Sequence, residues 1–577
     1  MLSWLKKTFK MVEWLPGYNR SQFYGDLSAG LTTGIMFIPQ CMAYAVIAGV
    51  PPIYGLYAGV IPLLVYPLFG TSKHLSVGPV AIDMLIVAAG VSLLAEPETE
   101  QYIAYTILLT LMAGALQLAM GSMRLGAVFN FFSRPVIAGF TLAAPIIIIF
   151  SQLNNLLGID LPNTQYVILI IKEVALNLQD IHPETFILGI AAIFSLALIR
   201  YLNPMLPGSM IVLALGILVA WLTGLSASGI ELVGEIPKGL PPLSLPDVNF
   251  NDVRELLSTA LTLALVQFMS VAALGRAFAK RHDYMIDSNH ELVAIGASNF
   301  LGSLFQSIPV SGSFSRSAAA EQANVQTPFA NVITSLLIIA TLLFLTPLFY
   351  YLPMPFLAAI IIVTSFNLID IAEFRFLFLT KKSDGFIAIF TAVCTLMIGI
   401  QEGILLGVVA SMVNILYRYS NPHVAELGLI PGTRTFMSLE RNPEAKPVEN
   451  ILVLRVDASF SFVNAEFFRD YILEKSRERN KSTRYVIIDG SSINTLDTTA
   501  AELLESMIKT LNNWNIELYI TGLKGPVRDV IQRSGLKKLL GADHFYRDPH
   551  EAVKAILNDM DSDDDKERLQ DYLDISG

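Results

Sequence analysis

Hydrophobic residues divide the chain into two parts with different patterns. Across residues 27–419, apolar runs of about 20 residues follow one another, and this length crosses the hydrocarbon core of a bilayer as a helix. From residue 433 onward, short apolar runs alternate with amphipathic stretches, as in a soluble α/β domain. The pattern predicts about fourteen transmembrane helices followed by one soluble domain. Clear spans begin near Leu27, Tyr102, Val136, Thr185, Met210, Ser258, Asn331 and Phe386, and shorter or interrupted ones lie around Pro62, Pro79, Gly296, Ser313, Pro355 and Gly403.

Basic residues between the predicted spans indicate their orientation, because loops rich in lysine and arginine remain in the cytoplasm. With fourteen spans, loops after odd-numbered spans carry only Lys172, Lys238 and Arg254. Loops after even-numbered spans carry ten basic residues, and the N-terminal segment is basic as well. We therefore predict that both termini are cytoplasmic. The ten residues are Lys73, Arg124, Arg134, Arg200, Arg276, Lys280, Arg281, Arg375, Lys381 and Lys382.

A proline-rich loop, residues 226–253, separates the seventh predicted span from the eighth. It divides the membrane part into two halves of seven spans. A unit with an odd number of spans must reverse its orientation when it is repeated, so the span count predicts an inverted 7+7 repeat. No strong residue-level repeat accompanies it, and the prediction rests on the count.

Composition and charge agree with this division. The chain has 577 residues, of which 53% are hydrophobic and 15% charged, whereas soluble proteins are about one quarter charged. Of the net charge of −10, residues 433–577 carry −5, with 25 acidic and 20 basic residues, and their acidic end is expected to form a solvated tail. Cys41 and Cys394 lie in apolar stretches without CxxC spacing, so neither a disulfide nor a metal site is predicted. The N-terminus is basic and amphipathic without a signal-peptide core, and is expected to lie on the cytoplasmic membrane surface.

Two short segments rich in glycine, proline and serine occupy corresponding positions in the two halves. Residues 76–81 (SVGPVA) open the third predicted span, and residues 309–317 (PVSGSFSRS) open the tenth. Such interrupted segments are the best sequence indication of a transporter's binding site. If two half-helices meet N-terminus to N-terminus, their unpaired N–H groups and positive dipole ends converge on one position. The pattern therefore predicts an anion site built from main chain.

Side chains in the second segment strengthen this prediction. Arg316 is the only arginine or lysine inside the predicted spans away from their ends, where a cation is costly unless it faces a polar cavity or a partner. Ser313 and Ser315 can donate hydrogen bonds to an oxyanion, and Arg316 can bind it bidentately or supply only a positive potential. The alternative is that Arg316 pairs with Glu321 or Asp83 and holds helices together.

Polar residues in the first and third spans are further candidates. Gln40 follows Pro39 in an otherwise apolar helix, and Tyr44 lies four residues later on the same face. Gln40 could line a pocket that Tyr44 closes, or the group could mark only a packed helix kink. Asp83, one turn into the third span, could titrate during transport or pair with a neighbouring helix.

Motifs along nearly the whole chain, in the right order, resemble those of the SulP anion transporters, the sulfate permease group that includes prestin and pendrin. They are Pro39-Gln40, PIYGLYAG at 52–59 continuing through Tyr66 to GTSK at 70–73, SVGPVA at 76–81, SRPVIAGF at 133–140, NHELVAIGASNFLGS at 289–303 and SGSFSRS at 311–317.

The resemblance implies a uracil-permease-like fold of fourteen spans in a 7+7 inverted repeat, an elevator-like movement and a homodimer. Spans 1–4 and 8–11 would form a mobile core, and spans 5–7 and 12–14 a gate. By position, the residues that match the family's substrate pocket are Gln40, Tyr44, Val80, Ala81, Ser313, Phe314, Ser315 and Arg316.

One position departs from the family pattern. Cation-coupled members commonly carry an acidic residue midway through the eighth span, and counting back from Arg276 puts Ser270 there. The missing carboxylate removes the obvious carrier of a coupled proton or sodium ion. Asp83 or Glu321 could substitute, or the protein could be an exchanger or an uncoupled conductor.

The soluble part alternates strands and helices. Residues 451–456, 485–489 and 517–521 are predicted strands, and residues 465–478, 498–512 and 527–534 are predicted helices. The turn at 489–499 resembles the central loop of STAS domains, where related bacterial antagonists are phosphorylated at the position of Asp497-Thr498. Capping of the following helix by one of these residues is the simpler interpretation, and a phosphoswitch is the alternative.

The predicted protein is thus a transporter of small inorganic anions in the inner (plasma) membrane, with sulfate favoured over bicarbonate or chloride. An uncoupled anion channel or an exchanger is the alternative. Neither enzyme activity, a cofactor nor nucleic-acid binding is predicted, whereas a cytoplasmic regulatory protein could bind the STAS domain. The expected parts are a cytoplasmic segment (1–24), the transport domain (25–420), a linker (421–449), the STAS domain (450–557) and an acidic tail (558–577).

Overall fold

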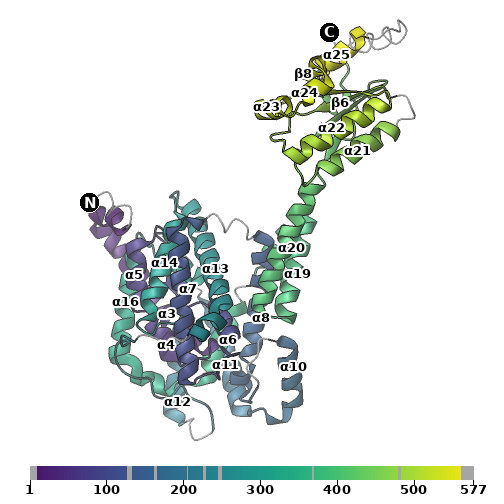
Figure 1. Ribbon diagram of the computed structural model, residues 1–577. Coiled ribbons are helices and arrows are strands. Elements are labelled where there is room, and N and C mark those ends of the chain that lie inside the picture. The colour runs from purple at the N-terminus through teal and green to yellow at the C-terminus, as the bar shows by residue number, and fades with distance from the viewer. Residues whose placement is uncertain are drawn as a thin grey trace. The chain divides into compact units, whose positions relative to one another are not determined.

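The structure is a computed structural model that describes residues 9–126, 133–161, 166–203, 206–224, 229–244, 250–366, 369–478 and 483–559. It consists of two compact units, Met1–Ser411 and Met412–Gly577 (Figure 1). The predicted acidic tail, beyond residue 559, lies outside the described residues, as do the first eight residues of the N-terminal segment.

The first half of the membrane unit begins with α2, and its long helix α3 has a defined start. Asn19 and Gln22 form a capping box, in which each side chain accepts a hydrogen bond from the other residue's main-chain N–H. The helices are α2 (Met11–Trp14), α3 (Arg20–Ile47), α4 (Pro52–Tyr57), α5 (Ile61–Phe69), α6 (Ala81–Val91), α7 (Glu100–Ser122), α8 (Arg134–Ser151), α9 (Leu153–Leu157), α10 (Val167–Leu176), α11 (Pro183–Leu202) and α12 (Gly208–Thr223).

The second half contains the longest helix, α13, and the short helix α15. After α16 the chain continues through a π-helical turn (Thr341–Leu345) and a 3₁₀ segment (Thr346–Tyr351). The helices are α13 (Phe250–Arg281), α14 (Ser288–Ser303), α15 (Phe314–Gln322), α16 (Phe329–Ala340), α17 (Met354–Phe366), α18 (Ile371–Thr380), α19 (Lys382–Met397) and α20 (Ile400–Ser420).

Nine helical segments among the described residues are long and apolar enough to cross a membrane, and α6 and α12 are shorter apolar helices. The prediction of a multi-pass helical membrane protein is therefore confirmed, whereas the count of fourteen stays a prediction. Several predicted spans are not single long helices. Pro52–Phe69 comprises α4 and α5, and α6 and α15 each begin only after a short extended segment.

These extended segments, β1 (Val77–Gly78) and β2 (Ser311–Gly312), form a two-stranded antiparallel ribbon inside the helical unit. Val77 pairs with Gly312, and Gly78 with Ser311. All four residues are buried. Segments more than 230 residues apart in sequence thus lie side by side in the membrane unit.

The second unit contains a six-stranded mixed sheet with strand order β4-β3-β5-β6-β7-β8. The four strands from β5 to β8 are parallel, and β3 is antiparallel to β4 and β5. The strands are β3 (Val424–Leu429), β4 (Phe436–Ser438), β5 (Ile451–Val456), β6 (Tyr485–Asp489), β7 (Glu517–Thr521) and β8 (Phe545–Tyr546).

Both faces of this sheet are covered, because alternate side chains of the central strands point to opposite sides. Leu452 and Leu454 face the core shared with α21 and α22, whereas Val453 faces a second core shared with α25. The helices are α21 (Ala465–Glu478), α22 (Thr498–Asn513), α23 (Gly525–Arg533), α24 (Leu536–Leu540) and α25 (Pro549–Asp559).

The structure agrees with the strands and helices predicted for this unit, with shifts of at most two residues at helix ends. It differs at residues 421–449, which were predicted as a linker. They contain β3 and β4, and β3 pairs with the central strand β5. Ala425, Leu427 and Leu429 are buried in the second core. These strands are short and their alternation is interrupted by Gly428, so their apolar pattern is weak.

Candidate anion-binding site

The β1–β2 ribbon determines where α6 and α15 begin. Because the two strands run antiparallel, the chains leave the ribbon in opposite directions, and α6 starts at Ala81 and α15 at Phe314. Hydrogen bonds extend the ribbon on one side. Ser313 N donates to Ser76 O at 3.0 Å, and Ser76 N donates to Ser317 Oγ at 2.9 Å. The N-termini of two short helices are therefore fixed on either side of one pair of buried strands.

Arg316 lies in the first turn of α15 and is completely buried. Its guanidinium donates to Pro79 O at 3.0 Å and to Gln40 Oε1 at 3.3 Å, and Nη1 lies 3.9 Å from Cys41 Sγ. Its Nε has no hydrogen-bond partner among the described residues. Every one of these acceptors is neutral, so no described carboxylate compensates the positive charge of Arg316.

The alternative that Arg316 holds helices together through an ion pair is therefore contradicted. Glu321 instead accepts from Arg281 at 2.7 Å and from His282 at 2.6 Å. Asp83 accepts from Gln267 Nε2 at 3.2 Å. An unpaired cation buried in a membrane protein favours an anionic ligand, because desolvation without a counter-charge is costly.

Gly78 and Phe37 shape the space around this cation. The Arg316 guanidinium lies over the Phe37 ring, 5.1 Å from its centroid. Gly78 has a φ of +152°, and a Cβ there would lie 2.8 Å from Arg316 Nη2 and would also clash with Phe37. Only glycine allows the ribbon to approach the guanidinium this closely.

The predicted pocket residues come from three helices, of which α3 contacts both α6 and α15. Gln40 and Tyr44 are buried on α3, and Val80 and Ala81 form the start of α6, which has no side-chain cap. Ser313 is the N-cap of α15, and its Oγ lies 3.4 Å from Ser315 Oγ. Phe314 is 58% exposed and Ser315 is also exposed, whereas Arg316 beside them is buried. Ser313 is buried, so of the two hydroxyl groups only that of Ser315 belongs to an exposed residue.

The candidate coupling residues have different surroundings. Asp83 is fully buried. Ser270 is half-buried, its hydroxyl donates to Val266 O at 3.1 Å, and it lines a small, mostly apolar cavity with Ile82 and Phe140. Glu321 forms the ion pairs with Arg281 and His282 described above.

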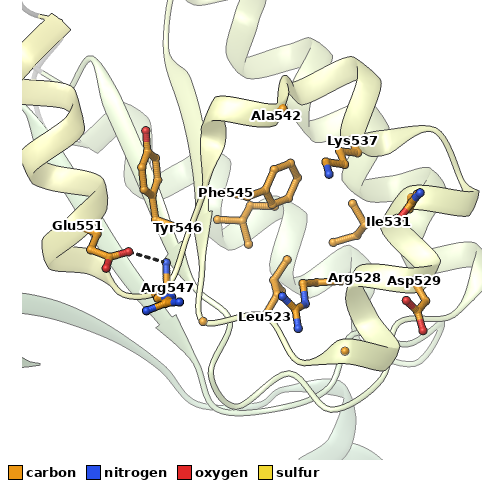
Figure 2. Close-up of a pocket in the computed structure, with 14 residues that line it drawn as sticks. Leu523, Arg528, Asp529, Ile531, Lys537, Ala542, Phe545, Tyr546, Arg547 and Glu551 are labelled. Atoms are coloured by element: carbon orange, nitrogen blue, oxygen red, sulfur yellow. Dashed lines mark hydrogen bonds between the residues drawn. The ribbon is translucent and has the colours of Figure 1, made fainter.

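The second unit contains a separate cavity of about 720 Å³, which is lined by residues of α23, α24, β8 and the start of α25 (Figure 2). Arg528, Lys537 and Arg547 line it, but so do Asp529 and Glu551. Since both signs of charge are present, this cavity has less of the character of an anion site than the surroundings of Arg316. We therefore place the candidate anion-binding site in the membrane unit.

Comparison with known proteins identifies the family of the chain. The profile of the sulfate permease family matches residues 23–391, and that of the STAS domain matches residues 442–552. The chain is 34% identical to "Sulfate transporter 4.1, chloroplastic" of Arabidopsis thaliana, over 97% of this chain and 84% of that protein. This chain belongs to the sulfate permease family. The predicted resemblance is thereby confirmed, and the second unit is a STAS domain.

Other known proteins are also similar to this member of the sulfate permease family. It is 32% identical to a probable sulfate transporter of Mycobacterium tuberculosis (strain H37Rv), over 95% of this chain and 99% of that protein. Its fold is similar to that of SLC26A9, with a TM-score of 0.87 at 23% identity over 98% of this chain and 94% of that one. The transmembrane domain of the cyanobacterium bicarbonate transporter BicA aligns with a TM-score of 0.58 at 22% identity, over 68% of this chain and 98% of that domain.

Three groups that contact the Arg316 side chain were not predicted from the sequence. They are the Phe37 ring, the Cys41 thiol and the carbonyl oxygen of Pro79. Phe37 lies three residues before Gln40, so the helical period places both on one face and was a usable signal. A contact to a main-chain carbonyl has no such signal, because every residue carries one.

Proposed function

We propose that this protein is a secondary transporter of small inorganic anions, with sulfate favoured and bicarbonate or chloride next. The observation that carries the proposal is the buried, uncompensated charge of Arg316 at the start of α15, beside the uncapped start of α6. Helix N-termini and a guanidinium together favour an oxyanion. The names of the sulfate transporters to which the chain is similar support sulfate as the first candidate.

The pocket would consist of Gln40, Tyr44 and the residues at the two helix starts. Main-chain N–H groups of α6 and α15 would bind the anion, Ser313 and Ser315 would donate hydroxyl hydrogen bonds, and Arg316 would supply the positive potential behind them. The residues of the proposed site are Gln40, Tyr44, Val80, Ala81, Ser313, Phe314, Ser315 and Arg316.

Transport would follow an elevator-type alternating-access cycle in a 7+7 inverted repeat of fourteen spans. Spans 1–4 and 8–11 would carry the site past a gate formed by spans 5–7 and 12–14. We further propose a homodimer in the plasma membrane, with both termini in the cytoplasm and a STAS domain that binds a cytoplasmic regulatory protein.

An uncoupled channel or an exchanger without cation coupling is the second candidate function. The observation that favours it is Ser270, whose hydroxyl is bonded to its own helix and which provides no carboxylate in α13. Uptake that responds only to the anion gradient would select this candidate.

Flux measurements on the reconstituted protein test the proposal. Purified full-length protein in lipid vesicles should take up labelled sulfate, and unlabelled sulfate, bicarbonate or chloride should compete according to their affinities. Empty vesicles are the control. Failure of the wild-type protein to bind or move any of these anions would overturn the proposal.

A further inference from the structure

We propose that Asp83 binds the proton whose movement drives anion uptake. This inference rests on the proposed anion transport and specifies its energy source. Asp83 lies in the first turn of α6, three residues after Val80. Its carboxyl group is completely buried, and Oδ1 has no hydrogen-bond partner among the described residues. A buried carboxylate without a counter-charge is costly, whereas a carboxylic acid at the same position carries no charge.

The surroundings of Asp83 are polar but neutral. Gln267 Nε2 on α13 donates to Asp83 Oδ2 at 3.2 Å. The Ser311 hydroxyl on β2 lies beside the same carboxyl group and is itself buried without a partner among the described residues. The Ser311 hydroxyl can donate to an ionised Asp83 and can accept from a protonated one, so the pair can be hydrogen-bonded in both states and the proton can leave and return.

On the helices that pack against α6, no charged side chain among the described residues forms a hydrogen bond or ion pair with Asp83, whose side-chain partners are Gln267 and Ser311. These helices are α3, α7, α8 and α13. Cys41 and Tyr44 on α3 interact with Arg316 rather than with Asp83, and Tyr102 on α7 donates to Ala48 O. Arg134 on α8 pairs with Glu373, and Arg276 near the end of α13 donates to Ser288. None of these described groups neutralises the Asp83 carboxyl.

A chain of buried amides fixes the orientation of Gln267. Val310 N donates to Asn299 Oδ1 at 2.8 Å, and Asn299 Nδ2 donates to Val310 O, so the main chain determines which end of this amide carries the donor. Asn299 Nδ2 and Gln117 Nε2 then both donate to Gln267 Oε1, at 3.1 and 2.8 Å. Gln267 is left with its N–H₂ group toward Asp83.

This orientation favours a proton over a sodium ion. Sodium needs several oxygen ligands, but the Gln267 oxygen is occupied by two donors, and its N–H₂ group cannot bind a cation. A proton needs only the carboxylate oxygen and one acceptor, and Ser311 supplies the acceptor. We therefore assign the site to a proton.

Asp83 is coupled to the anion site through α6 and β2. A negative charge in the first turn of α6 opposes an anion at the N-terminus of the same helix, whereas a neutral Asp83 does not. Ser311 belongs to the ribbon that precedes Ser313. Anion and proton therefore favour each other's binding, and by linkage each raises the affinity for the other by the same factor. Joint binding of the two is what proton–anion symport requires.

The test compares wild type with Asp83→Asn, which keeps the size of the side chain and removes its charge. Full-length proteins are reconstituted in vesicles that contain a trapped pH-sensitive dye. For wild type we expect sulfate affinity to fall at least about fivefold between pH 6 and pH 8. An inward proton gradient should accelerate sulfate uptake and acidify the lumen. Asp83→Asn should bind sulfate with an affinity independent of pH and should neither respond to the gradient nor acidify the lumen.

Glu321→Gln is the matched control, because it removes a carboxylate of the same region that is already paired with Arg281 and His282. It should retain both gradient-driven uptake and lumen acidification. Ser311→Ala supplies a second test in case Asp83→Asn fails to fold. Loss of a hydroxyl that hydrogen-bonds the carboxylate should move the midpoint of the pH dependence of uptake to higher pH.

Three outcomes would overturn the inference. They are lumen acidification that persists in Asp83→Asn, an unshifted pH profile in Ser311→Ala, and wild-type sulfate exchange that ignores the proton gradient. The last outcome leaves anion transport itself intact. Absence of sulfate binding and exchange in wild type at every pH would instead refute the proposed function.

Discussion

The Arg316 guanidinium donates a hydrogen bond to the main-chain carbonyl oxygen of Pro79 over 3.0 Å, and this bond joins the start of α15 to the residue before the start of α6. Since a carbonyl oxygen is neutral, the bond orients the guanidinium without cancelling its charge. The same is true of Gln40 and of the Phe37 ring. Arg316 is thereby held in position as a net positive charge in the interior.

Substitution of this charge should change which anions are preferred. In Arg316→Ala, the main-chain N–H groups of both helix starts remain, so binding is retained in part. Because Coulomb attraction scales with the charge of the ligand, divalent sulfate should lose more affinity than monovalent chloride. Competition binding at matched ionic strength measures the ratio of the two dissociation constants. An unchanged sulfate-to-chloride ratio would contradict this assignment.

Ser315 should contribute a hydrogen bond to the anion itself. Hydrogen bonds to charged groups contribute about 1.5–3 kcal/mol, so Ser315→Ala should weaken sulfate binding by about tenfold or more. Ser195→Ala is the control, because Ser195 is a partly exposed serine of α11 whose hydroxyl donates to Ala191 O at 2.7 Å. Equal sulfate affinity in the two variants would show that the pocket has been misplaced.

The sequence sufficed for the main features of the fold. Long apolar runs identify membrane helices because a helix that crosses the hydrocarbon core needs about 20 apolar residues. The alternation of strands and helices over residues 451–521 identifies the STAS sheet. It did not suffice for β3, where the strand is short and glycine interrupts it. The ribbon of Val77 with Gly312 was also not predicted, because pairing between two-residue strands depends on tertiary contacts rather than on local pattern.

For the site, the sequence identified Arg316 because a cation within an apolar span is costly unless it faces a polar cavity or a partner. It could not decide between an ion pair and a free charge, since that choice depends on which side chains the fold brings within 4 Å. The amide chain from Val310 to Asp83 was missed for the same reason. Gln117, Gln267 and Asn299 lie on three helices and are individually unremarkable polar residues.

Gly78 should be required for the ribbon to approach Arg316. A Cβ at this position would lie 2.8 Å from Arg316 Nη2 and collide with the Phe37 ring, at a φ of +152° that side chains rarely adopt. Gly78→Ala should therefore reduce the melting temperature of the purified protein and weaken sulfate binding. Gly17→Ala is the matched control, since nothing lies within 4 Å of a Cβ there. Equal melting temperatures and equal affinities for the two variants would contradict this steric argument.

Stability should depend on pH through His74, in the loop before β1. Burial, and then the neighbouring His282, lower the pKa of His74 to about 4. The two rings stack with centroids 4.1 Å apart. An unfolded histidine has a pKa of about 6.5, so between about pH 4 and pH 6.5 the unfolded chain binds more protons than the folded one. This contribution to stability is fully present above that window and is lost as the pH falls through it.

We therefore expect the melting temperature of wild type in detergent to fall between pH 7 and pH 5, and to fall less steeply in His74→Gln. The comparison of slopes isolates His74 from other titrating groups, because these are present in both proteins. Parallel slopes for the two proteins would exclude His74 as the titrating group.

Asp497 should stabilise the STAS domain as the N-cap of α22. Its Oδ1 accepts a hydrogen bond from Ala500 N at 2.9 Å, and its Oδ2 accepts from Phe462 N at 2.7 Å. Asp497→Ala should cost about 0.5–2 kcal/mol of unfolding free energy, as for other lost caps. Thr498→Ala should cost little, because Thr498 is exposed. Hydrogen exchange of the α22 amides in the full-length protein measures both, and equal protection in the two variants would contradict the capping role. If Thr498 were phosphorylated instead, its substitution would alter regulation while leaving this protection unchanged, so the two roles are separable.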